Sequence, residues 1–119
     1  MFEYWMATDL CSMPDIHRIT GRAFTNDSGA NKIGVKVSLG GEPAALIGDV
    51  TANIILPTGE TVTATGDKDG NRAWVVLPDK AYEVSGKIRI FLKLTDGTST
   101  VTIGAAEGTV YQSTTSEVI

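Results

Sequence analysis

The chain has 119 residues, of which 42% are hydrophobic and 20% charged, and its net charge is -4. This length accommodates one domain with a core of its own, and the apolar content is too high for a disordered chain. The acidic balance argues against nucleic acid as a partner, because binding to phosphates requires a basic surface. No basic segment is followed by a long apolar run, so we expect neither a signal peptide nor a membrane span.

Residues 1–15 differ in composition from the rest of the chain. Three of the eight aromatic residues (three Phe, two Trp and three Tyr) lie in the first five positions. We find no periodicity here and predict an extended arm that is covered by something, since a free apolar arm is a liability in water. The arm either folds back onto its own sheet or docks on a neighbouring subunit or larger partner. In the second case Phe2, Tyr4, Trp5 and Met6 are candidate docking residues.

The next segments are predicted to be a weak strand at 16–24, a polar loop at 25–31 and a clear strand at 33–39. Residues 47–66 then predict an antiparallel hairpin around the turn Pro57-Thr58-Gly59-Glu60. Apolar side chains alternate with polar ones on both sides of this turn, and the polar face is rich in threonine. The hairpin is the clearest local feature of the chain.

Three further elements follow the hairpin. The strand at 73–77 is apolar on both faces, so we expect both faces to be covered. Residues 78–84 begin with a proline and predict one short helical turn. The strand at 86–94 alternates cleanly, and Asp96-Gly97 predicts a hairpin turn into a last strand that contains Val101, Ile103 and Ala105.

Together these elements predict an all-β fold. Roughly six or seven short strands with regular turns are typical of a β-sandwich. No helix is long enough for a parallel αβ unit. We therefore predict a single antiparallel β-sandwich, Ig-like or jelly-roll-like, over 25–119, preceded by the arm and a first strand over 1–24.

Catalytic chemistry is not expected. His17 is the only histidine and Cys11 the only cysteine, so neither a histidine-rich metal site nor an intramolecular disulfide is available. A Cys–His pair would lack an oxyanion-hole motif. The glycines lie at turns without a phosphate-binding pattern. We predict a protein that is not an enzyme and has no cofactor.

One acidic loop has the alternate spacing of a calcium site. Asp67, Asp69 and Asn71 match its first ligand positions. Arg72 stands where the turn glycine is needed, and Pro78 stands where the bidentate glutamate is needed. We therefore expect a solvated turn and no metal.

Two aromatic residues lie on the second face of predicted strands. Trp74 and Phe91, together with Val76, place apolar surface opposite a face that already fills a core. These aromatic side chains either pack within the sheet or form part of a carbohydrate or partner surface. Association is a common way to bury such surface, so we expect a homo-oligomer, with a trimer as the expected state.

A series of turn-and-strand patterns runs in order from residue 33 to residue 111. It comprises Gly41-Glu42-Pro43 with Leu46 and Gly48, Leu56-Pro57-Thr58-Gly59-Glu60-Thr61, Gly70-Asn71, Ala73-Trp74-Val75-Val76-Leu77-Pro78, Ala81-Tyr82, Gly86-Lys87-Ile88, Lys93-Leu94-Thr95-Asp96-Gly97, and Gly108-Thr109-Val110-Tyr111 with Ser113-Thr114-Thr115. This order resembles the N-terminal domain of the baseplate upper protein family and the related head fibre proteins of phages of Gram-positive bacteria. The closing pattern resembles the head fibre group in particular.

The resemblance implies a β-sandwich that attaches to a virion and carries no catalytic residue. We expect a capsid decoration or head fibre protein on the head surface, bound to the major capsid protein or another virion protein. It would be made in the bacterial host cytoplasm and would bind neither nucleic acid nor membrane. A tail or baseplate adaptor is the first alternative, and a free carbohydrate- or protein-binding module is the second. The chain stops at Ile119 with no fibre region, which favours a short decoration protein.

Overall fold

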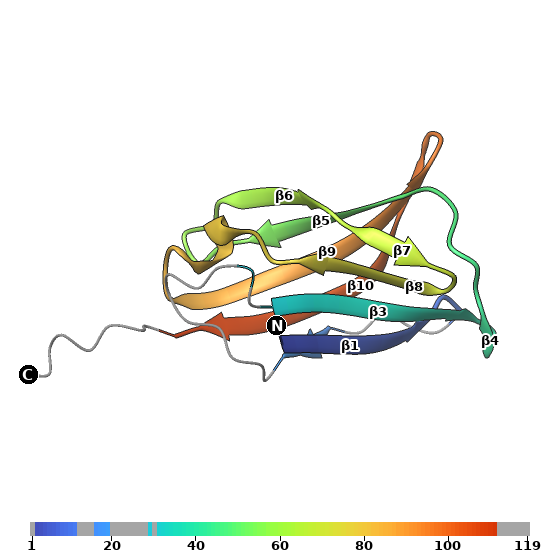
Figure 1. Ribbon diagram of the computed structural model, residues 1–119, viewed down its shortest axis with the longest axis horizontal. Coiled ribbons are helices and arrows are strands. Elements are labelled where there is room, and N and C mark those ends of the chain that lie inside the picture. The colour runs from blue at the N-terminus through green and yellow to red at the C-terminus, as the bar shows by residue number, and fades with distance from the viewer. Residues whose placement is uncertain (1, 12–15, 20–28, 30, 112–119) are drawn as a thin grey trace, which may run out of the picture.

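The computed structural model describes residues 2–11, 16–19, 29 and 31–111, and most of them belong to β-strands. The strands are β1 (Phe2–Asp9), β2 (His17–Arg18), β3 (Asn31–Leu39), β4 (Glu42–Pro43), β5 (Asp49–Ile55), β6 (Thr61–Thr65), β7 (Asp67–Asp69), β8 (Arg72–Val76), β9 (Gly86–Asp96) and β10 (Ser99–Val110), with a short 3-10 helix, η1 (Asp79–Tyr82), before β9. Sheet A has the order β1-β3-β8-β7, with β4 also on β3, and sheet B has the order β2-β10-β9-β5-β6 (Figure 1). The predicted all-β sandwich is confirmed.

The two sheets are mixed rather than wholly antiparallel. β1 pairs with β3 in parallel, from Phe2 opposite Asn31 to Asp9 opposite Ser38. β2 runs parallel to β10. The chain thus places one N-terminal strand at the edge of each sheet. The alternation of side chains is the same in parallel and antiparallel strands, so it carried no information about this direction.

The predicted hairpin forms as β5 and β6. The Leu56 amide donates to the Glu60 carbonyl and the Gly59 amide to the Leu56 carbonyl, each at 2.8 Å. Gly59 adopts a φ of 93°, a conformation that residues with a Cβ rarely take. Val50, Ala52 and Ile54 are buried and the threonines face outward, as the pattern predicted.

A β-bulge interrupts the last strand. A bulge between Thr102 and Gly104 shifts the register of β10 against β9. Ile103, which lies at the bulge, points into the core, and Ala106 and Val110 do so after it. Val101 is exposed because the β9–β10 hairpin continues past the end of the sandwich (Figure 1). The predicted strand through Val101, Ile103 and Ala105 is confirmed as part of β10, although the three side chains differ in burial.

Other predicted elements are met in part. β8 buries Ala73 and Val75, and its second face is covered at Trp74 but left open at Val76, which is 38% exposed. The predicted helical turn forms as η1. Within the predicted strand 16–24, two residues pair as β2, while residues 20–24 lie outside the described residues. Most of the predicted loop 25–31 and residues 113–115 also lie outside them.

A buried polar pair joins η1 to sheet A. Tyr82 is fully buried and Asn31 is 5% exposed. The Asn31 Nδ2 group donates to the Tyr82 hydroxyl at 3.0 Å, while the Leu77 amide donates to the Asn31 carbonyl at 3.0 Å. Burying an amide side chain is unfavourable unless it is hydrogen-bonded. This hydrogen bond therefore fixes the position of η1 on sheet A, in addition to the apolar packing around Tyr82.

We expect Tyr82→Phe to lower the free energy of unfolding by about 1–3 kcal/mol, because the buried Asn31 amide loses its acceptor. Urea unfolding followed by tryptophan fluorescence measures this. The double variant Asn31→Leu with Tyr82→Phe removes both polar groups and should recover part of the loss. If the losses of the two single variants simply added in the double variant, this interpretation would be contradicted.

Candidate functional site

The predicted docking residues do not form one surface. Met6 is 2% exposed and belongs to the core, and Tyr4 packs against that core. Phe2 is 54% exposed at the start of β1. Trp5 and Trp74 lie together on the outer face of sheet A. Phe91 lies on the outer face of sheet B, in the β9 strand.

The N-terminal segment is a strand of the sandwich and not an arm. Residues 2–9 pair with β3 along their whole length, so the first alternative, folding onto its own sheet, is the one observed. Tyr4 and Met6 face the core, whereas Trp5 faces outward. Large apolar side chains on both faces hid the period of two in the sequence. The expected boundary between arm and sandwich, at residue 24, lies outside the described residues, but β1 and β2 each belong to a sheet.

On the outer face of sheet A, the Trp5 side chain of β1 lies over Gly34 of the neighbouring strand β3. Trp5, Gly34 and Trp74 are direct neighbours across β1, β3 and β8. A Cβ on Gly34 would lie 2.4 Å from the Trp5 ring, so only glycine lets the indole lie on the sheet. The two indoles meet edge to face, with centroids 6.0 Å apart and planes at 66°. This geometry is a favourable one for aromatic pairs.

Charged side chains surround the two indoles. The Lys32 Nζ lies 5.3 Å from the Trp74 ring centroid, and the Arg72 Cζ lies 5.9 Å from that of Trp5. Glu3 accepts a hydrogen bond from the Trp5 indole nitrogen at 3.0 Å and lies 3.9 Å from the Lys32 ammonium. We call these five residues the sheet A cluster. Each exposed contact contributes about 1 kcal/mol or less, but together they orient both rings.

Asp9 joins the end of β1 to the turn between β3 and β4. Its carboxylate accepts hydrogen bonds from the backbone amides of Cys11 (2.8 Å), Gly41 (2.7 Å) and Gly40 (3.0 Å), and from the Ser38 hydroxyl (3.2 Å). These donors, the Cys11 amide foremost, favour the charged form and hold the pKa of Asp9 below its ordinary value of 3.8. Hydrogen bonds to Asp9 therefore stabilise the end of β1, in addition to the side-chain packing on its two faces.

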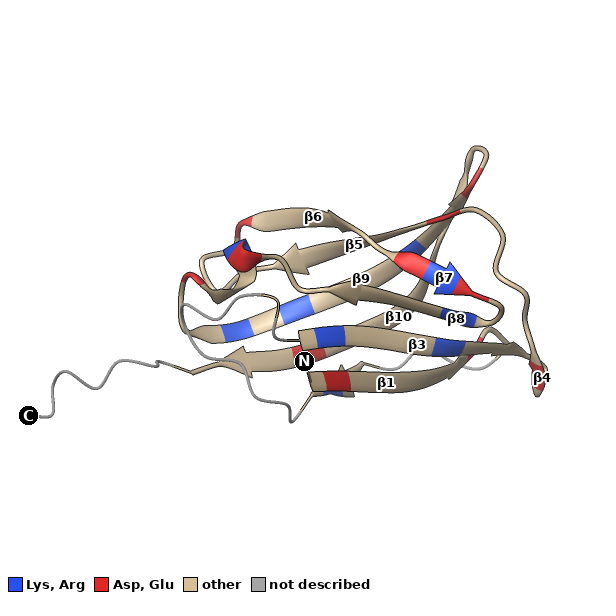
Figure 2. Cartoon of the chain, viewed as in Figure 1, with Lys and Arg blue, Asp and Glu red and all other residues tan. Residues whose placement is uncertain are grey.

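Sheet B presents a different outer face. Basic side chains are spread along β9 at Lys87, Arg89 and Lys93, as Figure 2 shows. Arg89 pairs with Glu107 at 3.5 Å. Phe91 stands between Arg89 and Lys93, and with Lys93 it lines a shallow hollow of about 300 Å³. This hollow is the candidate binding site that the outer faces offer.

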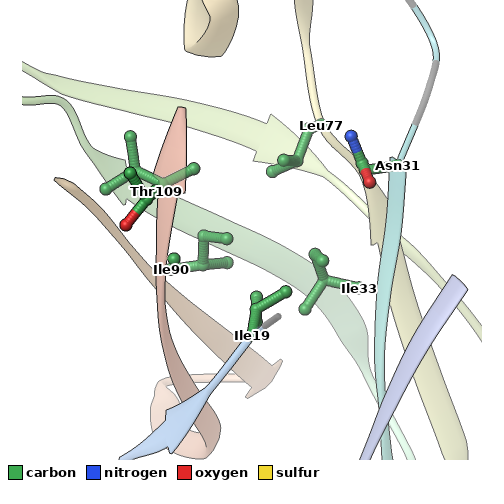
Figure 3. Close-up of a pocket in the computed structure, with 8 residues that line it drawn as sticks. Ile19, Asn31, Ile33, Leu77, Ile90 and Thr109 are labelled. Atoms are coloured by element: carbon green, nitrogen blue, oxygen red, sulfur yellow. The ribbon is translucent and has the colours of Figure 1, made fainter. Parts of the chain in front are cut away.

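A second space lies between the two sheets and is not a ligand site. Ile19, Ile33 and Ile90 point toward one another around it, beside Leu77 (Figure 3). Its volume is about 20 Å³, which is room for about one water molecule, whereas sites for small molecules have volumes of about 300 Å³ or more. The Asn31 side chain at its wall is already bonded to Tyr82. We interpret it as a packing gap.

The residues considered for chemistry are far apart in the topology. Cys11 follows β1 beside the β3–β4 turn, whereas His17 pairs with Ala106 at the edge of sheet B. Asp67 and Asp69 lie in β7, and Asp69 pairs with Arg72 at 3.7 Å. Within the part of the chain that the structure describes, no group of three or more His, Cys, Asp or Glu side chains is placed to hold a metal ion. No helix in this part is long and apolar enough to cross a membrane.

The fold is similar to that of solved structures, one of which is the N-terminal domain of phage TP901-1 ORF48. The TM-score is 0.56 at 11% sequence identity, and the match covers 96% of this chain and 100% of that chain. At this identity the likeness concerns the fold alone. No protein-family model matches the chain. No curated protein matches it either.

We expect Gly34→Ala to lower the free energy of unfolding by about 1–3 kcal/mol, because the new methyl group displaces the Trp5 ring. Urea unfolding measures the change. In a Trp5→Ala background the clash is absent, so the same glycine substitution should cost clearly less there. Equal costs in the two backgrounds would show that the Trp5 ring does not rest on Gly34.

We expect Asp9→Asn to destabilise the chain at neutral pH. The pKa of Asp9 is lower in the folded chain than in the unfolded chain, so the unfolded chain binds the proton more readily. The contribution of the Asp9 carboxylate to the free energy of unfolding is therefore complete above its pKa in the unfolded chain. It is lost as the pH falls through its pKa in the folded chain. Urea midpoints at neutral pH and below pH ~3 should show a difference between wild type and variant that shrinks in acid. A difference that stays constant with pH would argue against the carboxylate's role.

Proposed function

We propose that this chain is a non-enzymatic structural protein of a phage virion. The single observation that carries the proposal is the fold likeness to the N-terminal domain of phage TP901-1 ORF48, which extends over 96% of the chain. The ordered turn-and-strand patterns from residue 33 to residue 111 support the same role independently of the coordinates. Both lines of support concern the virion role in general.

The finer proposal is a capsid decoration or head fibre protein on the head surface, bound to the major capsid protein. The pattern Gly108-Thr109-Val110-Tyr111 supports this location because it resembles the head fibre group. A tail or baseplate adaptor is the second candidate. The fold likeness to a phage protein domain supports a virion role in general and does not support the head location specifically.

We further propose that the chain acts as a trimer. Val76 and Phe2 are exposed apolar side chains that the sandwich leaves open, at 38% and 54% exposure. The sheet A cluster uses Trp5 and Trp74 within the monomer, so these two rings support association less than the sequence led us to expect. Association into an oligomer with closed symmetry, of which a trimer is one form, buries such surface around a symmetry axis.

Electron microscopy of intact particles tests location and copy number together. We expect density for this sandwich on the head surface, grouped in threes. Density at the tail or baseplate would replace the head proposal with the adaptor, and single copies would contradict the trimer. Absence of the chain from purified particles by mass spectrometry would overturn the virion role. Deleting residues 1–15 is a poor test of attachment, because it removes an edge strand and the core residue Met6.

A further inference from the structure

The hollow on sheet B owes its shape to side-chain size. Phe91 has Asn53 and Ala105 as its direct neighbours across the sheet. Lys93 has Thr51 and Thr102 as its neighbours. Long side chains in β9 are therefore flanked by short ones in β5 and β10, which leaves the ring and the ammonium group standing over a depression. On the outer face of sheet A, by contrast, the side chains of the sheet A cluster pack against one another.

The lining of the hollow combines one aromatic ring with several polar groups. It consists of Asn53, Ile55, Thr61, Phe91, Lys93 and Thr102. Phe91 and Ile55 provide apolar walls. The Asn53 amide, whose Oδ1 already accepts a hydrogen bond from the Thr63 hydroxyl at 3.4 Å, still offers its two N–H donors, and the two hydroxyls offer both donors and acceptors. A volume of about 300 Å³ lies at the lower end of the range for small-ligand sites. An aromatic wall opposite amide and hydroxyl groups complements a sugar ring, which has an apolar C–H face and a polar rim.

The charge of the site favours an anion. Lys93 is the only charged residue in the lining, and it forms no ion pair with any residue that the structure describes. Arg89, by contrast, is already paired with Glu107. Lys87 lies on the same face of β9 but outside the hollow. This basic strand stands out on a chain whose net charge is -4.

We propose that the hollow binds a sugar unit that carries a carboxylate or phosphate group, as part of an anionic glycan. The Phe91 ring contacts the C–H face of the sugar, and Asn53 and the two threonines bond to its hydroxyls. Lys93 donates charge-assisted hydrogen bonds to the anionic group. The proposal goes beyond the virion role and does not rest on it, because the site lies within one chain.

Amide NMR of the full-length, nitrogen-labelled chain tests the proposal, with glucuronate, glucose phosphate and neutral glucose as probes. We expect both anionic sugars to shift the amide signals around Asn53, Phe91 and Lys93 in a saturable way, and glucose to bind more weakly. Lys93→Met should weaken the anionic sugars roughly tenfold, to the level of glucose, since a hydrogen bond to a charged group is lost. Phe91→Ala should weaken all three probes.

Lys87→Met is the matched control, because Lys87 lies on the same face of the same strand but outside the hollow. It should leave binding of all probes unchanged. Circular dichroism and melting temperatures establish that each variant is folded, and Phe91→Leu replaces Phe91→Ala if the latter unfolds. Shifts that do not saturate, equal affinity for glucuronate and glucose, or equal losses in the two lysine variants would overturn the proposal. Stronger binding of a poly-glutamate peptide at the same amides would overturn it too, and would assign the hollow to an acidic protein segment.

Discussion

The sandwich depends on the packing of both faces of its first strand, β1, against the core on one side and against the outer face of sheet A on the other. β1 is an edge strand with one hydrogen-bonded neighbour, and edge strands are the least supported elements of a sheet. On its inner face Met6 is 2% exposed, which contributes about 1.5–3 kcal/mol of apolar burial. On its outer face the Trp5 ring lies on Gly34 and against Trp74. Two large side chains at consecutive positions thus clamp sheet A from both sides.

The clamp depends on small residues elsewhere in the chain. Gly34 gives the indole its place on the outer face, and Gly104 gives Met6 its place in the core, where a Cβ would lie 3.1 Å from the Met6 Cε. Gly34 belongs to β3 of sheet A and Gly104 to the bulge of β10 in sheet B. The bulge that re-aims β10 therefore lies beside the residue that anchors β1. Edge strand, core and bulge form one packing unit.

This arrangement gives the two outer faces different roles. On the outer face of sheet A the aromatic and charged side chains contact one another, since Glu3 and Lys32 orient the indoles that they border. The face of sheet B leaves an aromatic ring and an ammonium group at a hollow that has both apolar and polar walls. A surface whose groups already satisfy one another gains less from a ligand than one whose groups await partners. The sheet B face is for this reason the better candidate for recognition.

The amino-acid pattern by itself determined the all-β class, the β5–β6 hairpin, the inward face of β9 and the helical turn at η1. These features are local, because alternation, turn glycines and a leading proline act over a few neighbouring residues. Only the tertiary structure decided the parallel pairing of β1, the bulge in β10 and the separation of Trp74 from Phe91 onto different sheets. Each depends on which strands become neighbours, and residues as distant as Trp5 and Trp74 meet only after the chain has folded. Trp5 could not be assigned to a strand from its own surroundings, because the glycine that receives it lies in β3.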